Sequence, residues 1–338
     1  MIGATTGLIL SNVASSLQPT IVKLSQLNSY DQTILRILIF AISCVILTKW
    51  FRYSDRWIRA SFRPEGLGMN VVNILSVYAG IHGFQMLPVG VGLTVFYTFP
   101  IYLTLLSQWE RQREHHELTE ENQSRLWYGI GISFLGLLLI FAPDWLTFFR
   151  ETPQWTETWR GFAWVSISAM THAFTIYYYH KMHPDRDSAP ARLGSLTLPT
   201  ALAIVALSVW NPGKWALGNV WEGSDDAFRW QVLLLAIFQA TVGLGGFLLH
   251  FYSIPKLPKE WISSLSFLIL VGGYLFGWFF FGEALNWRMG AGTVLVVIGI
   301  AVVSRALKGE FEGFQELHKE REETKRFLYD KLKLIALS

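Results

Sequence analysis

The sequence has little charge and only one cysteine. Only 16% of its 338 residues are Asp, Glu, Lys or Arg, whereas a soluble domain averages about a quarter. The lone cysteine, Cys44, cannot form an intramolecular disulfide, which excludes a small disulfide-stabilised secreted fold. The first residues lack a basic stretch and a cleavage motif and enter an apolar run almost at once, so no removable signal peptide is predicted.

Motifs that would signal catalysis or a metal centre are also missing. The chain has no HExxH, no G-x-S-x-G and no paired carboxylates at metal-ligand spacing. His115 and His116 lie beside glutamates, but adjacent positions do not share a helix face, so we interpret them as surface residues. We therefore expect no catalytic residue, no metal and no cofactor.

Long apolar runs take the place of the missing charge, and 51% of the residues are hydrophobic. Trp261–Gly282 contains no charge over 22 residues, and a short turn connects it to a second run, Met289–Ser304. A helix of about 20 apolar residues spans the roughly 30 Å hydrocarbon core of a bilayer. The two runs are therefore predicted to form an antiparallel membrane hairpin. Gly290, Gly292 and Gly299 would let the second helix approach a neighbour closely.

Ten runs of this kind predict an all-α polytopic membrane protein with ten transmembrane helices. They cover residues 3–23, 33–50, 67–86, 90–108, 127–143, 161–180, 194–210, 231–251, 261–281 and 289–305.

The distribution of Lys and Arg predicts the orientation of these spans. With the N-terminus in the cytoplasm, the cytoplasmic loops and tail hold 21 of these residues and the opposite side holds 5, or 7 when Lys23 and Arg36 are included. Cytoplasmic loops of membrane proteins carry an excess of Lys and Arg. The bias predicts that both termini are cytoplasmic. We expect a multi-pass protein of the cell (inner) membrane.

Two groups of five predicted spans resemble each other. Residues 86–94 and 256–264 each form a short turn with a proline between two spans, and the following span ends in Glu110 or Glu283. Each glutamate leads to a glycine-bearing span. Because five is an odd number, the second group must be inverted in the membrane, as in many transporters. The predicted units are residues 1–143, residues 161–305 and a charged, helix-favouring cytoplasmic tail, residues 306–338.

Several short features along these spans occur together in one known family. They are Leu10-Ser-Asn12, Arg36, Pro100, Glu110, Phe281-Gly-Glu283 and the pair Gly290 and Gly299. Over about residues 3–305, the chain resembles the drug/metabolite transporter superfamily and, within it, the ten-helix EamA-type transporters.

The resemblance implies two EamA-like repeats that move small metabolites through a central cavity by alternating access. It places that cavity mainly among the first, third, fourth, sixth, eighth and ninth spans, and it implies that Glu110 and Glu283 are structural.

Polar side chains inside the predicted spans indicate where such a cavity would lie, because they usually face the interior of a helix bundle. The helical spacing of Ser168, His172 and Thr175, for example, predicts one polar stripe. Any single Ser, Thr, Asn or Gln has the alternative role of linking two helices by a hydrogen bond worth about 1 kcal/mol. The candidate substrate-binding residues are Asn12, His82, Tyr97, His172, Gln239, His250, Ser266 and Tyr274.

The ionisable residues limit the mechanism and the substrate. No Asp or Glu lies in the middle of a predicted span, so His82, His172 or His250 would carry any coupled proton, since imidazole titrates near neutral pH. Lys23 and Arg36 lie near span ends, where they can snorkel toward the interface. No mid-span cluster of Lys or Arg is present, which argues against a multiply charged anion. We expect efflux of a small zwitterionic or neutral metabolite, such as an amino acid.

Two other function classes stay open. A membrane-embedded enzyme acting on lipid or isoprenoid head groups would need a convergent catalytic set, which the sequence does not show. A membrane scaffold or sensor would work through the tail, which is too short for a domain-sized fold. The expected partners are a small-molecule substrate and the lipid bilayer, with no nucleic acid, and the oligomeric state stays open.

Overall fold

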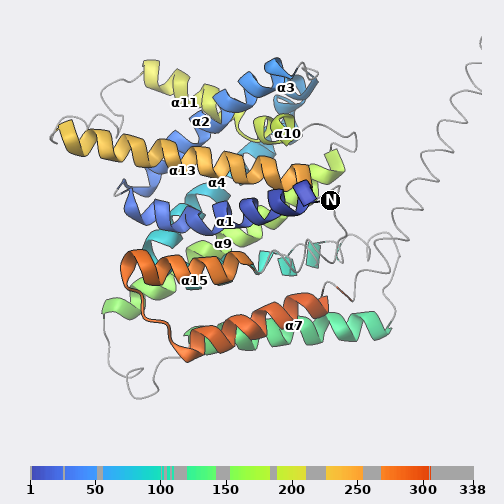
Figure 1. The fold of residues 1–338 in the computed structure, drawn as a ribbon. Helices are drawn as coiled ribbons and strands as arrows, with labels where there is room; N and C mark the ends of the chain where they lie inside the picture. Colours follow the sequence, from blue (N-terminus) through green and yellow to red (C-terminus); the bar gives the residue numbers. More distant parts are fainter. Residues whose placement is uncertain are drawn as a thin grey trace, which may run out of the picture.

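The computed structural model is helical throughout its regular structure. It describes residues 2–25, 27–51, 56–99, 101–102, 105–106, 109, 120–141, 153–182, 189–210, 226–253, 268–303 and 305. The helices are α1 (Ile2–Leu24), α2 (Ser29–Trp50), α3 (Arg56–Ser61), α4 (Pro64–Met86), α5 (Val89–Phe96), α7 (Glu120–Phe141), α9 (Pro153–Met182), α10 (Ala189–Ser195), α11 (Leu198–Trp210), α13 (Asp226–Ser253), α15 (Leu268–Phe281) and the Trp287–Val303 helix that follows it (Figure 1).

Several of these helices have the length and composition of membrane spans. Among the residues that the structure describes, four segments are long and apolar enough to cross a bilayer, namely Ser29–Trp50, Pro64–Met86, Glu121–Ile140 and Val232–Leu249. Three shorter apolar helices accompany them, Leu193–Leu207, Ile269–Phe281 and Trp287–Val303.

The exposed surface of these helices is apolar, and polar side chains lie inside. On α2, Ile42 and Ile46 are each 57% exposed, while Asp31, Gln32 and Thr48 are buried. Large contiguous apolar patches are rare on soluble monomers and mark surfaces that meet lipid or a partner. The arrangement is that of a polytopic membrane protein.

The predicted spans and the observed helices differ at two places. The span predicted over residues 90–108 begins as α5, which ends at Phe96, and the span predicted over 194–210 is divided into α10 and α11. The tail and residues 261–267 of the ninth predicted span lie outside the described residues. The total of ten spans therefore stays a prediction.

The break between α10 and α11 shows how the bundle satisfies a carbonyl that no helix can pair. Pro199 has no N–H, so the carbonyl of Ser195 lacks the usual helical donor. Asn70 of α4 supplies one, because its Nδ2 lies 2.9 Å from the Ser195 oxygen, and Asn73 Nδ2 lies 3.1 Å from the Leu196 oxygen. Helix breaks inside a membrane depend on such partners from neighbouring helices.

The most extensive helix contacts are those of α4 with α9 and of α1 with α13. In the first pair, Ser168 Oγ donates to the Ser76 carbonyl at 2.7 Å and Ser76 Oγ donates to the Ser168 carbonyl at 3.1 Å. In the second pair, Ser11 Oγ donates to the Gly246 carbonyl at 2.8 Å. Figure 1 shows α13, α1 and α15 as successive neighbours, and α5 contacts both α15 and α9. Small residues let these backbones approach closely.

Two backbones approach each other closely where α7 packs against the Trp287–Val303 helix, along one edge of the bundle (Figure 1). A Cβ on Gly136 would lie 2.6 Å from the Gly292 carbonyl oxygen, and one on Gly292 would lie 2.6 Å from that of Gly136. Gly129 and Gly299 are opposed in the same way, at 2.7 and 2.5 Å. Of the three glycines that the sequence analysis singled out on the second helix, Gly292 and Gly299 form this reciprocal contact, and Gly290 does not.

We predict that Gly299→Leu disrupts this helix pair. Its side chain would collide with the Gly129 carbonyl and the Ser133 hydroxyl, and overpacking of this kind costs about 1–3 kcal/mol. Thermal unfolding of the purified protein in detergent should show a melting temperature lowered by several degrees. Gly290→Leu is the matched control on the same helix, because a Cβ at that position would have no heavy atom within 4 Å. Equal losses in the two variants would contradict the assignment.

We also predict that Asn70→Leu destabilises the fold by about 1–3 kcal/mol, because it removes the hydrogen bonds that Asn70 makes with the Gly66 and Ser195 carbonyls and with the Thr200 hydroxyl. Gln123→Leu, at an exposed position on α7, makes a similar change of polarity without removing a buried hydrogen bond. Thermal unfolding of both variants, measured side by side, separates the two effects. A melting temperature for Asn70→Leu equal to that of the wild type would refute the role of Asn70.

Candidate substrate site

Helix α5 is interrupted inside the bundle. Its eight residues end at Phe96 after a rise of about 12 Å, and the backbone turns at Tyr97 and Thr98 before the described residues 99, 101–102, 105–106 and 109 are again helical. After it, Thr98 N donates to the Val95 carbonyl at 3.1 Å and Ile101 N donates to the Thr98 carbonyl at 2.9 Å, which are the tighter bonds of a 3₁₀ turn. Pro100, which cannot donate a backbone hydrogen bond, explains the break. Discontinuous helices near the membrane centre commonly form the substrate sites of transporters.

Three hydroxyl groups meet beside this break, and we call them the hydroxyl triad. Tyr274 Oη of α15 lies 2.7 Å from Thr293 Oγ1 and 3.2 Å from Thr94 Oγ1 of α5, and the two threonine oxygens are 3.3 Å apart. Thr94 Oγ1 also donates to the Gly90 carbonyl at 2.8 Å. The triad brings polar groups from three helices to one point in the bundle interior.

Two further predicted site residues, Tyr97 and His172, share a pair of aromatic neighbours. The His172 ring of α9 lies 5.2 Å from that of Phe96 and 5.1 Å from that of Phe99. The Tyr97 ring lies 5.8 and 5.9 Å from the same two rings. Tyr97 comes three residues after Thr94, so the structure gathers Tyr97, His172 and Tyr274 around the end of α5. We call this region the α5 break site.

His82 belongs to a different polar cluster, where α2 begins and α4 ends. Its Nδ1 lies 2.8 Å from the Ser29 hydroxyl, which also donates to Gln85 Oε1 at 2.6 Å. The imidazole stacks on Tyr78 at 5.7 Å and meets the Trp164 ring of α9 edge-on at 5.3 Å. The structure therefore places His82 apart from the contacts of the α5 break site.

The remaining predicted site residues lie on other helices or outside the described part. Asn12 is buried on α1, with 1% of its surface exposed. Gln239 and His250 lie on α13, but their side chains are not among those described. Ser266 lies outside the described residues. Ser168 belongs to the predicted polar stripe with His172. It links α9 to α4 by a hydrogen bond, which is the alternative role given above for a serine in a membrane span.

Glu283 holds three helices together at one end of the bundle. Its Oε1 accepts a hydrogen bond from Lys23 Nζ of α1 at 2.7 Å, and its Oε2 accepts one from the Val89 backbone N–H, the first of α5, at 2.8 Å. A carboxylate is favoured at a helix N-terminus. Gly282, with φ 63°, ends α15 in the left-handed conformation and so positions Glu283. Lys23 also lies over the Phe281 ring, 5.2 Å from its centre.

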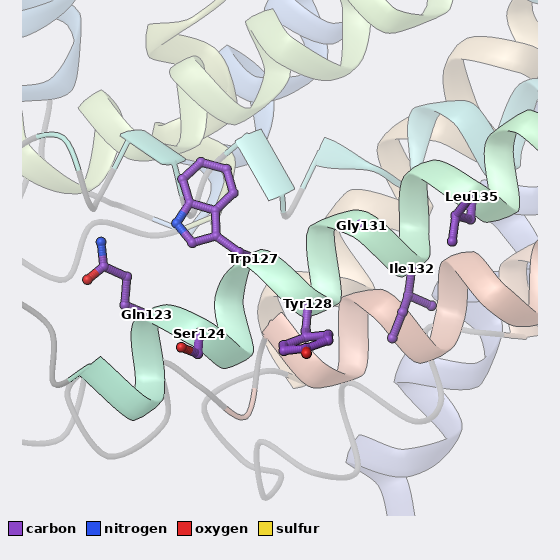
Figure 2. Close-up of a pocket in the computed structure, with 7 residues that line it drawn as sticks. All are labelled: Gln123, Ser124, Trp127, Tyr128, Gly131, Ile132 and Leu135. Carbon is purple, nitrogen blue, oxygen red and sulfur yellow. The ribbon is translucent and has the colours of Figure 1, made fainter.

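A shallow hollow on α7 is not a convincing substrate site. All seven residues that line it come from this one helix, as Figure 2 shows. Trp127, Tyr128 and Leu135 in it are 55%, 72% and 59% exposed. A substrate site of a carrier needs groups from several helices that face the interior, so we interpret the hollow as part of the lipid-facing surface.

Sequence analysis missed several residues that complete these clusters. Thr293 was hidden in an apolar, glycine-bearing run, and its isolated hydroxyl was the available signal. Ser29 was placed before the predicted span, whereas α2 already begins there. Asn70 and Asn73 are spaced at i and i+3 on one helix face, which could have marked them as a polar pair.

Comparison with known proteins gives one family and one fold. The model of the EamA-like transporter family matches residues 159–305. A solved structure titled "Crystal structure of protein" superposes with a TM-score of 0.52 and 13% identity, over 89% of this chain and 97% of its own. At that identity the likeness concerns the fold alone. No curated protein matches the chain.

We predict that Glu283→Ala lowers the free energy of unfolding by about 1–3 kcal/mol, because it leaves Lys23 and the Val89 N–H without their shared partner. The side chains of Lys23 and Glu283 are only 18% and 19% exposed. Glu121→Ala is the control, because its pair with Arg125 is 72% and 56% exposed and such pairs contribute little. Thermal unfolding of both variants decides the matter, and equal losses would rule out the structural role of Glu283.

Proposed function

We propose that this protein exports a small zwitterionic or neutral metabolite. The ground is that residues 159–305 match the EamA-like transporter family of the drug/metabolite transporter superfamily. The family match confirms the resemblance seen in the sequence, and it supports a multi-pass membrane protein that transports small compounds. An amino acid or a compound of similar size and polarity is the substrate class we propose. The cell's inner membrane is the proposed location.

The observation that carries this proposal is the α5 break site. The turn that interrupts the helix carries Tyr97 and Thr98, and we place this turn near the membrane centre as part of the proposal. The hydroxyl triad, Tyr97 and His172 would line a cavity that accepts polar groups on an otherwise apolar metabolite. Asn12, Gln239, His250 and Ser266 stay proposed members of the same cavity, and His82 is proposed to line its entrance.

Alternating access requires two halves that can rock against each other. We propose two inverted units, residues 1–143 and 161–305, followed by the cytoplasmic tail, residues 306–338. The helix contacts support two inverted units. If each helix is replaced by its counterpart in the other unit, the α4–α9 pair becomes the α13–α1 pair and the α5–α9 pair becomes the α15–α1 pair, and all four pairs are in contact. The same exchange maps α7 and the Trp287–Val303 helix onto each other, in agreement with their reciprocal glycine contacts. Both termini are proposed to be cytoplasmic.

We do not favour a membrane-embedded enzyme. Among the described residues, no group of three or more His, Cys, Asp and Glu side chains lies together as a metal site would require. The hydroxyl triad contains neither a carboxylate nor an imidazole that could activate a nucleophile.

Binding and transport assays test this proposal together. Purified protein would be screened by thermal shift against amino acids, nucleosides, sugars and amines, and compounds that raise the melting temperature would be followed in inside-out vesicles. We expect a compound that is both bound and accumulated, with binding lost in His172→Ala or His250→Ala. Trp127→Ala, on the exposed face of α7, should leave binding unchanged. Folded protein that neither binds nor transports any compound would refute the proposal.

A further inference from the structure

Arg36 lies well inside a membrane-spanning helix. It is the eighth residue of α2 (Ser29–Trp50), so it lies about 10 Å along the axis from the first residue. A charged side chain at such a depth is expensive and usually faces the bundle interior, where it meets a partner or a functional site.

The contacts of Arg36 use only part of its hydrogen-bonding capacity. Its Nη1 donates to Gln18 Oε1 of α1 at 3.2 Å, and its guanidinium carbon lies 5.2 Å from the centre of the Phe40 ring. Its Nε is buried, and no hydrogen-bond acceptor among the described residues reaches it. A guanidinium has five N–H donors in a planar fork, so most of that fork is left for another acceptor.

Asp31 and Glu283, two carboxylates at the same end of the bundle, have other hydrogen-bond partners, although Asp31 Oδ1 is buried without one in the described part of the chain. Asp31 Oδ2 accepts from Asn28 Nδ2 at 2.7 Å, and Glu283 is held by Lys23. Within the described ranges, neither carboxylate forms an ion pair with Arg36. The positive charge is therefore not neutralised by this part of the chain.

The Arg36 side chain lies against side chains of the bundle. Helical side chains tilt toward the helix N-terminus, so the Phe40 ring, one turn further along α2, lies over the turn that carries Arg36. With Gln18 of α1 on another side, the guanidinium is held between side chains of α1 and α2. Anchoring of Arg36 at the interface, as expected from the sequence, stays a prediction.

A third helix closes around this group. A Cβ on Gly243 of α13 would lie 2.9 Å from Gln18 Nε2 and 3.1 Å from Phe40 Cζ. The glycine therefore lets the α13 backbone pack directly against the two side chains that hold Arg36. Gln18 of α1 and Arg36 and Phe40 of α2 are brought together under α13, which contacts both helices.

We propose that Arg36 binds the carboxylate of the transported substrate. This inference rests on the proposed transport function and narrows the substrate class to small monocarboxylates, amino acids included. A planar guanidinium matches a carboxylate with two parallel hydrogen bonds, and such charge-assisted bonds strengthen away from water. Gln18 orients the fork, and Phe40 covers one face of it. A single cation suits one negative charge, in keeping with the scarcity of mid-span Lys and Arg.

The test compares compounds that differ only at the carboxylate. L-leucine, L-phenylalanine, L-threonine and their primary amides would be titrated into the full-length protein, with the melting temperature and calorimetric Kd as readouts. We expect the acids to bind and the amides to bind roughly 10- to 100-fold more weakly, because a charge-assisted interaction is lost. This comparison needs no variant, so it holds even if a substitution at position 36 impairs folding.

Variants locate the effect. Arg36→Gln should weaken binding of the acids by a similar factor and abolish their preference over the amides, while Arg36→Lys, which keeps the charge, should restore part of it. Arg59→Gln removes an exposed cation of α3 and should change neither Kd. The unliganded melting temperature and the gel-filtration profile of each variant would confirm that it is folded.

The outcomes separate the two proposals. Acids and amides that bind and are transported equally, unaffected by Arg36→Gln, would overturn the role of Arg36 and leave the transport function standing. A response to added phosphatidylglycerol that depends on Arg36, without any response to the acids, would assign Arg36 to a lipid phosphate and likewise overturn the proposal. Acids that bind through Arg36 but are not moved across vesicles would support the site and refute transport.

Discussion

A chain surrounded by hydrocarbon must satisfy its own backbone polar groups, and the architecture of this protein depends on how it does so. Unbroken helices solve the problem along most of their length. Where a proline interrupts a helix, nearby groups must supply the missing hydrogen bonds of the backbone. Asn70 donates one to the Ser195 carbonyl near Pro199, and a 3₁₀ turn provides others before Pro100. Irregular backbone is tolerated where the bundle supplies partners, and it leaves polar groups at membrane depth that a substrate can meet.

Close packing of helices takes the place of the hydrophobic effect inside the membrane. Lipid tails are as apolar as leucine, so helix association depends on van der Waals contact and on occasional hydrogen bonds. Gly136 and Gly292 allow close van der Waals contact between two helices, and the Ser76 and Ser168 hydroxyls provide hydrogen bonds between two others. The α4–α9 and α1–α13 contacts exchange with each other when the two groups of helices are exchanged, in keeping with the two inverted units that we propose.

The cations at one end of the bundle have different surroundings. Lys23 is neutralised by Glu283, which at the same time caps α5, so the pair is a structural joint between helices. Arg36 has an amide and an aromatic ring for neighbours among the described residues, with no carboxylate. Two positive charges that look equivalent in the sequence are thus distinguished by the acceptors that the fold brings to them.

The sequence by itself determined the membrane class, the family resemblance and most helix positions, because apolar length and glycine spacing are properties of single segments. The position of α5's end and the meeting of Tyr274 with Thr293 were decided only by tertiary structure. Which polar side chain links two helices and which faces a shared site depends on contacts between segments far apart in the chain. Ser168 and His172 lie on one helix four residues apart, and only the packing of α4 and α5 against α9 assigns them different surroundings.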